Sequence, residues 1–473
     1  MKFFYSTKIK FFLAAVACFL SASGFSQSNF NSAYSRFGLG VLTNPGSFTH
    51  FGMGGVTTPI IDPLVVNFAN PASYAFLEST TMQITARGGY TKASTQTEQS
   101  KFGSGQISEM GFGFKKPGSL WGIAIGVSPY SSVDYQFKST TQVSDSISAK
   151  YSYTGSGGLN KASVGTSRLF RFSRGNNALD STNVSNPDTT LNARKLHQLA
   201  LGVNANYIFG NITRNNVSFL NYSQYFATHD RTNLWAQGFI FEAGLLYKVN
   251  LNTRYDDQKR IKSGSALQIG ADYSLNSTLS ATYDQLTTLT DTIGAVILSD
   301  TSLSILNQKG DLKIPQNISF GFAIKTYNKK WGTLTIAADY KMQDWSRYRL
   351  ILNSDAQLDK GLKAASTISV GLEYKPSTDN STDLIHRLNY RLGARSTESS
   401  LLLNDTRIRQ SGISGGISIP VIKSSSKFHL GAEYGSTGTT AAGLVKEDYL
   451  NFMIGFSLTP SAFDRWFRQV KYD

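Results

Sequence analysis

The chain has 473 residues, a formal net charge of +15 and one cysteine, and it contains 42 glycines, 30 phenylalanines and 23 tyrosines. A single cysteine excludes an internal disulfide and a cysteine-based zinc cluster. Lys and Arg are scattered and form no long run, so the basic balance does not indicate nucleic-acid binding. The glycine and aromatic content is typical of long strands with aromatic girdles.

The N-terminus has the layout of a signal peptide. Lysines within residues 2–10 precede an apolar stretch, Phe11–Leu20, and small residues follow it. The apolar stretch is shorter than the roughly 20 residues that a membrane-spanning helix needs. We therefore predict a signal peptide over residues 1–26, a mature protein that begins at Gln27, and export to the outer membrane of a Gram-negative cell.

The next segment, residues 27–79, is expected to form an N-terminal hatch. It is rich in Gly and Pro, lacks sustained alternation, and still carries many apolar side chains. An irregular apolar segment of this length is not expected to extend into water, so we predict that it plugs the lumen of a barrel. Its candidate hatch and gating residues are a glycine-rich turn and an Asn-Pro-Ala run: Gly52, Gly54, Gly55, Asn67, Asn70, Pro71 and Ala72.

Residues 80–458 alternate between apolar and polar side chains, as strands with one apolar face do. Leu267–Leu275, Ile318–Lys325 and Ile368–Tyr374 are clear examples. A membrane barrel places the apolar face outward, in lipid, and the polar face inward. The fold class predicted is therefore all-β, a transmembrane antiparallel β-barrel of about 14 strands. Its predicted lumen-facing residues are Asp272, Asp339, Glu373, Glu433 and His429.

Turn residues divide this region into strands and connections. We predict a short turn at Gly210 and long external loops at Thr141–Arg194, Asn276–Ile314 and Gln343–Ala365. Beyond the last strand, residues 459–473 carry apolar side chains at helical spacing and are predicted to form a periplasmic amphipathic tail.

The sequence offers little support for catalysis. Gly412–Gly416 matches the Gly-x-Ser-x-Gly pattern formally, but strand-like alternation continues after it, where a nucleophile elbow needs a helix. The five histidines show no metal-binding spacing. We therefore predict no enzyme activity, no metal and no cofactor.

Three short motifs resemble the hatch of the FadL/OMPP1/TodX outer-membrane transporters. They are Arg36–Gly40, Gly52–Gly55 and Asn67–Ala72, the last directly before the first strand. A Trp-Ser motif of that family is similar to Asp344–Tyr348, which contains two aromatic residues expected at the extracellular end, Trp345 and Tyr348.

The resemblance implies a channel for hydrophobic small molecules, such as long-chain fatty acids or aromatic hydrocarbons, gated by the N-terminal hatch. Outer-membrane lipid and a hydrophobic ligand would then be the partners. FadL-like barrels also accompany the type IX secretion translocon of Bacteroidetes, so an accessory of that translocon, acting as shuttle or plug, is the alternative function. A basic chain with this export signal is not expected to bind nucleic acid.

Overall fold

The computed structural model describes residues 32–43, 46–116, 118–144, 147–173, 196–220, 226–255, 261–293, 296–352, 356–358, 361–376, 385–421 and 425–459. The predicted signal peptide, the predicted start at Gln27 and the predicted tail beyond Thr459 lie outside these residues. No helix in the described part of the chain is long and apolar enough to cross a membrane.

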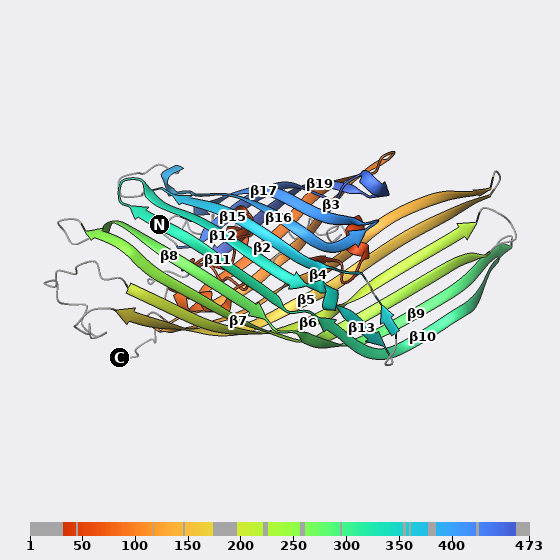
Figure 1. Cartoon of the computed structure of the whole chain (residues 1–473), viewed down its shortest axis with the longest axis horizontal. Coiled ribbons are helices and arrows are strands. Elements are labelled where there is room, and N and C mark those ends of the chain that lie inside the picture. The colour runs from red at the N-terminus through yellow and green to blue at the C-terminus, as the bar shows by residue number, and fades with distance from the viewer. Residues whose placement is uncertain are drawn as a thin grey trace, which may run out of the picture.

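Fourteen strands of the described chain form a closed antiparallel barrel (Figure 1), which confirms the predicted fold class. The last strand pairs with the first, from Lys446 opposite Ser94 to Leu458 opposite Met82, so the wall has no outer edge at this seam. The wall strands are β2 (Thr81–Ser94), β3 (Gln99–Phe114), β4 (Trp121–Ser144), β5 (Ile147–Ser173), β6 (Leu196–Leu220), β7 (Ala227–Tyr255), β8 (Ile261–Ser274), β11 (Asn317–Asn328), β12 (Gly332–Asp344), β15 (Ala364–Lys375), β16 (Asn389–Leu403), β17 (Thr406–Pro420), β18 (Lys427–Thr437) and β19 (Lys446–Leu458).

Two predicted connections were wrong, and the errors cancelled in the strand count. The predicted loop Thr141–Arg194 contains β5, and the predicted turn at Gly210 lies inside the single long strand β6. A Cβ atom at Gly210 would lie 2.3 Å from the carbonyl oxygen of Gly158 on β5. Glycine is therefore needed there because two strands approach closely, not because the chain turns.

The other two predicted loops contain further strands. β9 (Ser277–Ile293) and β10 (Val296–Ile314) form a hairpin, and β9 pairs with the first part of β7. β10 pairs with β13 (Arg349–Leu352), which follows the short helix η4 (Trp345–Arg347) and pairs with β14 (Ala356–Leu358). These strands extend the sheet beyond one end of the barrel, where the β4–β5 and β6–β7 hairpins also project (Figure 1).

The alternation of the wall strands produces an apolar outer surface. Ile269 and Phe320 are 43% and 52% exposed, whereas their neighbours Gln268 and Ser319 are 2% and 3% exposed. Leu372 and Ile454 are likewise exposed on the outside. A continuous apolar surface around a closed barrel is suited to contact with lipid, because water would disfavour so large an apolar patch.

The N-terminal segment lies inside the barrel (Figure 1). Its elements are short because glycine and proline interrupt them: η2 (Ala33–Arg36), β1 (Val41–Leu42), α2 (Phe48–Gly52) and η3 (Pro71–Phe76). Ser47 begins α2 with a capping box completed by His50, and Asn70 caps η3 with Pro71 in its first position. We call residues 46–79 the plug. The remaining short helices, η5 (Ile385–Arg387) and η6 (Ala441–Gly443), lie in connections between wall strands.

Candidate functional site: plug, wall gap and lumen cavity

The plug is held against the wall by glycines on the inner face. At these positions a Cβ atom would lie within 3 Å of a plug atom, which real side chains do not tolerate. Such contacts occur on ten wall strands, so the plug is enclosed on many sides. The glycines and their plug partners include Gly111 and Gly126 with Phe68, Gly122 with Tyr74, Gly202 and Gly244 with Pro71 and Asn70, Gly270 with Thr58, Gly321 with Pro59, Gly371 and Gly393 with Met53, Gly431 with Phe51, and Gly455 with Phe48.

Asn70 binds the plug to the wall and also joins two segments of the plug to each other. Its Nδ2 donates to the carbonyl oxygens of Thr58, at 2.8 Å, and of Leu245 and Ala271 on the wall, at 3.2 and 3.4 Å. Its Oδ1 accepts from the backbone N–H of Ala72 at 3.1 Å. Pro71 has no N–H to satisfy in this buried place. Both Asn70 and Ala72 are fully buried.

Asn67 has an internal role. Its Nδ2 donates to the carbonyl oxygen of Thr57 at 2.8 Å, and its Oδ1 accepts from the N–H of Ala69 at 3.1 Å. The structure therefore brings Asn67 and Asn70 to the same plug loop, Thr57–Thr58. The hydrogen bonds satisfy backbone groups that would otherwise be buried without partners.

The predicted glycine turn follows α2. Gly54 and Gly55 have φ angles of 70° and 85°, in the left-handed region that favours glycine, and the Gly55 N–H donates to the carbonyl oxygen of His50 at 2.8 Å. The Gly54 N–H donates to the Ser414 hydroxyl at 2.9 Å. Gly52 lies against Arg391 of β16. β17 runs without interruption through Gly412–Gly416, so Ser414 is a wall residue that binds the plug and not a nucleophile on a strand-to-helix turn.

All five residues predicted to face the lumen are buried inside the barrel. Asp339 is central, because its Oδ2 accepts from the N–H groups of Thr57 and Thr58 at 2.8 and 3.2 Å. Lys341 lies 3.7 Å from the same oxygen. Asp339 therefore holds the plug loop that Asn67 and Asn70 also hold. Asp272, on β8, is not part of this loop contact.

The remaining acids form ion pairs within the lumen. Glu373 pairs with Arg391 at 2.7 Å and with Lys375 at 3.1 Å. Glu433 pairs with Arg395 at 2.7 Å and with Arg87 at 3.6 Å.

His429 lies on the same inner face. Its ring stacks on Phe48 of the plug, with centroids 3.4 Å apart, and both ring nitrogens contact serine hydroxyls, those of Ser418 and Ser457. The described residues contain no cluster of His, Cys, Asp and Glu placed to hold a metal ion.

The barrel wall is interrupted between β3 and β4. The two strands pair only over Met110–Phe114 and Ile123–Val127. Just beyond the Met110–Val127 pair, β3 has a bulge at Ser108. At the same level β4 contains Pro129, which has no N–H group to continue the ladder of hydrogen bonds. We call this interruption the wall gap.

The N-terminal segment covers part of the freed β4 edge. β1 pairs antiparallel with Ser131 and Ser132, and the Thr43 N–H donates to the carbonyl oxygen of Tyr130 at 3.0 Å. Nearby, Glu447 of β19 accepts from the Ser32 hydroxyl at 2.8 Å and from the Ala33 N–H at 2.6 Å. The N-terminal segment thus provides hydrogen-bond partners for backbone groups on the edge of β4 that would otherwise be unpaired.

A cavity of about 360 Å³ lies in the lumen beside the wall gap. Both flanks of the gap line it, through Gln106 and Ser108 on β3 and Ser128 and Pro129 on β4. One part of its surface is apolar, and the other carries charge. The apolar residues include Leu39, Leu42, Phe68, Ile240, Ile314 and Trp345, and the charged ones Arg87, Glu109, Lys161, Glu242, Lys341 and Arg395.

Trp345 and Tyr348 follow β12 at the end where the long hairpins project. They are 3% and 1% exposed, and they pack in an apolar cluster with Leu39, Leu279 and Leu312. Sequence reasoning did not identify Arg87, Arg395 or the inner glycines as site residues. Their only signal was position on the polar face of an alternating strand, which many residues share.

The fold and site define a class of protein: a closed β-barrel with an internal plug and a lumen cavity that opens toward a gap in its wall. Solved structures with this arrangement of strands include the Ralstonia pickettii toluene transporter TbuX, at TM-score 0.50 and 12% identity, covering 88% of this chain and 99% of that one. A TodX deltaS2S3 mutant, a monoaromatic hydrocarbon channel, matches at TM-score 0.51 and 12% identity, with 88% and 99% covered. The predicted resemblance to TodX-type barrels is confirmed at the level of the fold.

The family is given by the sequence. The BamG family model matches residues 8–177 and 189–473, so the chain belongs to the BamG family. A comparison with curated proteins gives no match.

Proposed function

We propose that this protein is an outer-membrane channel for hydrophobic small molecules, which enter the lumen cavity and leave sideways through the wall gap. The observation that carries the proposal is the position of the gap, since both of its flanks line the cavity. An apolar molecule in the cavity would meet the apolar surface around Leu39 and Ile240 and then the lipid-facing side of the wall. The similar barrels are a toluene transporter and a monoaromatic hydrocarbon channel, which is consistent with this ligand class.

A straight route through the plug is disfavoured. The inner glycines leave no room between wall and plug, and the Thr57–Thr58 loop is held by Asp339, Asn67 and Asn70. Moving the plug as a unit would break these buried hydrogen bonds together, at about 1 to 3 kcal/mol for each group left without a partner. Gating by the hatch is therefore assigned in this proposal to the part next to the gap, β1 and its flanking residues, which cover the freed edge of β4 and line the cavity.

Narrowing the gap tests the proposal. Ser128→Trp and Gln106→Trp place a bulky side chain at the cavity end of the gap, whereas Val127→Trp, one residue away, points into lipid and is 50% exposed. Uptake of labelled toluene and of a labelled long-chain fatty acid by cells that express each variant would be measured. We expect the first two variants to lose most of the uptake and Val127→Trp to retain it.

The comparison of the two labelled compounds addresses ligand class. A fatty acid would place its carboxylate near Lys161 or Lys341 and its chain on the apolar surface, while toluene needs only the apolar surface. If folded wild-type protein takes up neither compound above the background of a deletion strain, the channel proposal fails. The secretion-accessory alternative would then be tested by the export of secreted proteins in that strain.

A further inference from the structure

Two lysines face each other on the outer surface of the wall. Lys92 on β2 is the direct cross-strand partner of Lys101 on β3. Because alternate residues of a strand share a face, Lys92 lies on the same outward face as Tyr90, which is 70% exposed. In an antiparallel wall the β2–β3 hairpin turns at the same end as the β4–β5 hairpin, so the two lysines lie toward the end where the long hairpins project (Figure 1).

This pair of like charges has no compensation within the described chain. Directly opposite side chains in an antiparallel pair have Cβ atoms about 5 Å apart, and like charges at this distance destabilise the sheet. The other cross-strand partner of Lys92 is Asp448 on β19, but that carboxylate lies 2.9 Å from the Lys446 ammonium. Neither Lys92 nor Lys101 makes an ion pair or a side-chain hydrogen bond with a described residue, and this includes Glu98 in the nearby turn.

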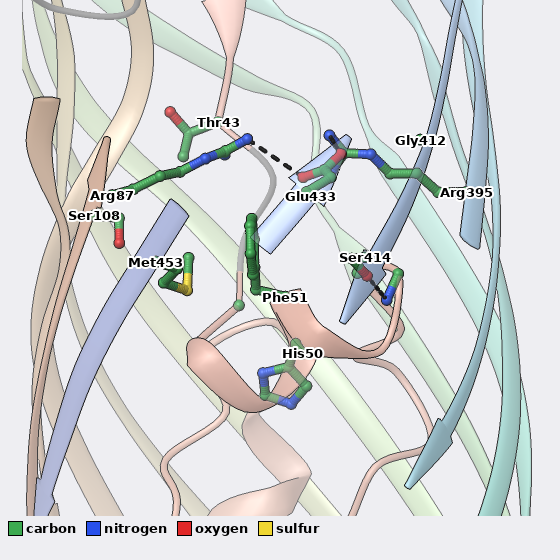
Figure 2. A pocket seen from close by; sticks show the side chains of 13 residues that line it. Thr43, His50, Phe51, Arg87, Ser108, Arg395, Gly412, Ser414, Glu433 and Met453 are labelled. Carbon is green, nitrogen blue, oxygen red and sulfur yellow. Dashed lines mark hydrogen bonds and ion pairs between the residues drawn. The ribbon is translucent and has the colours of Figure 1, made fainter. Parts of the chain in front are cut away.

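Like charges inside the barrel are arranged differently. Arg395 and Arg87 approach Glu433 from opposite sides, and their guanidinium nitrogens lie 2.7 and 3.6 Å from its carboxylate oxygens (Figure 2). A carboxylate of the protein thus bridges these two cations. The two outer lysines have no such bridge among the described residues, so an anion from the surroundings would take that place.

The apolar outer surface begins directly beside the lysines. Tyr90, Ile107 and Leu450 are 70%, 55% and 39% exposed on it, and Leu450 is the cross-strand partner of Tyr90. Tyrosine has an apolar ring and a hydroxyl group that prefers water, so it is typical of the boundary between hydrocarbon and headgroups. Lys92 lies two residues beyond Tyr90, about 7 Å farther along the strand, which is the level of the lipid headgroups.

The wall gap leaves this part of β3 accessible from the side. β3 pairs with β4 only over Met110–Phe114, so β4 does not pair with β3 at Lys101. On the same outer face a Cβ atom at Gly105 would meet nothing within 4 Å, so no side chain covers the backbone there. A lipid can therefore lie along β3 with its chains on the apolar surface and its headgroup at the lysines.

We propose that Lys92 and Lys101 bind the phosphate group of a lipid in the outer leaflet of the membrane. A phosphate group carries negative charge and several acceptor oxygens, so it would accept charge-assisted hydrogen bonds from both ammonium groups and remove their repulsion. The acyl chains would contact Tyr90 and Ile107. The site requires that the barrel lies in a membrane, but it requires neither a ligand in the lumen cavity nor passage through the wall gap.

Thermal unfolding of the full-length protein in dodecyl maltoside micelles tests the site. The midpoint would be measured with added lipid A that carries both of its phosphates, with the same lipid lacking phosphates, and with inorganic phosphate. We expect a saturable rise with the phosphorylated lipid alone. The double variant Lys92→Gln/Lys101→Gln should need roughly 25-fold more of this lipid for half of the rise, about fivefold for each lysine.

Two variants serve as controls. Lys92→Arg/Lys101→Arg keeps both charges and should retain the response. Arg409→Gln removes a charge from the outer face at the same end, but the Arg409 side chain is 73% exposed and already lies 2.9 Å from Glu398. Its lipid response should equal that of the wild type.

The lipid-free micelles give a further readout, because the Gln/Gln variant loses the repulsion between the lysines and should be at least as stable there as the wild type. A lower midpoint would assign the lysines a structural role and overturn the proposal. It would also be overturned by an equal rise with the lipid lacking phosphates or with inorganic phosphate, or by an undiminished rise in the Gln/Gln variant. Uptake of hydrophobic compounds reports separately on the channel proposal.

Discussion

The replacement Gly393→Ala would test how firmly the wall holds the plug. An added Cβ atom would lie 2.1 Å from the backbone nitrogen of Gly54 and 2.2 Å from the carbonyl carbon of Met53. Real Cβ atoms essentially never approach closer than 3.0 Å, so the plug backbone must move by about 1 Å. Gly371 confines Met53 from the neighbouring strand, where a Cβ would lie 2.6 Å from its carbonyl oxygen, so the shift cannot be made freely.

The expected cost follows from these contacts. Overpacking a close-packed interior costs about 1 to 3 kcal/mol, and a rigid backbone-to-backbone clash belongs at the upper end. A shift of Gly54 would also weaken its hydrogen bond to Ser414, worth about 1 kcal/mol. We therefore expect Gly393→Ala to lower the free energy of unfolding by about 3 kcal/mol or more.

Gly105→Ala is the control. Gly105 lies on β3, and a Cβ atom there would meet nothing within 4 Å. Alanine in a strand is favoured over glycine by roughly 0.5 to 1 kcal/mol, so this variant should be neutral or slightly stabilised. Urea unfolding of the full-length barrel in lipid vesicles, followed by tryptophan fluorescence, measures both. Equal stability of the two variants would show that the plug is loosely held and would refute the reasoning from contacts.

Three further outcomes are expected. Asn70→Ala should lower the free energy of unfolding by about 1 to 3 kcal/mol in the same urea assay, because buried carbonyl oxygens lose their donor, and an unchanged value would contradict the anchoring role. Ile269→Arg, on the lipid-facing surface, should lower the free energy of unfolding by about 2 to 4 kcal/mol, whereas Leu303→Arg, on the β9–β10 hairpin outside the wall, should lower it far less. Equal losses of stability in the two variants would refute the assignment of the two surfaces. Burial, and secondarily Lys341, lowers the pKa of His50 in the plug to about 3 from its ordinary 6.5, so the unfolded chain takes up this proton first as the pH falls. Stability from neutral His50 is therefore complete above about pH 6.5 and is lost progressively toward pH 3, by about 5 kcal/mol in total. His50→Gln should flatten this part of the pH–stability curve.

The sequence by itself determined the class of fold. Alternation such as that of Leu267–Leu275 has a period of two, so it fixes which side chains share a face, and a closed barrel is the arrangement of strands that can place such a face in lipid. The irregular composition of residues 27–79 likewise indicated a segment that cannot pair as a wall strand. Both inferences depend only on local chain geometry, which the sequence specifies.

Local patterns misassigned β5 and Gly210 for a physical reason. β5 runs past the wall into the projecting hairpins, where neither face needs to be apolar, so its alternation fades while its pairing with β4 and β6 continues. Glycine permits both a turn and a close approach of strands, and Gly210 serves the second purpose.

Only the tertiary structure decided the sites. The wall gap depends on where β3 stops pairing with β4, and the shared ion pairs of Glu433 join Arg87 and Arg395 from strands far apart in sequence. Many polar residues on the alternating strands point into the lumen, so polarity alone does not distinguish a plug contact from a cavity residue. That distinction depends on which inner residues the plug covers, and the path of the plug through the lumen is set by many weak contacts made simultaneously with distant strands.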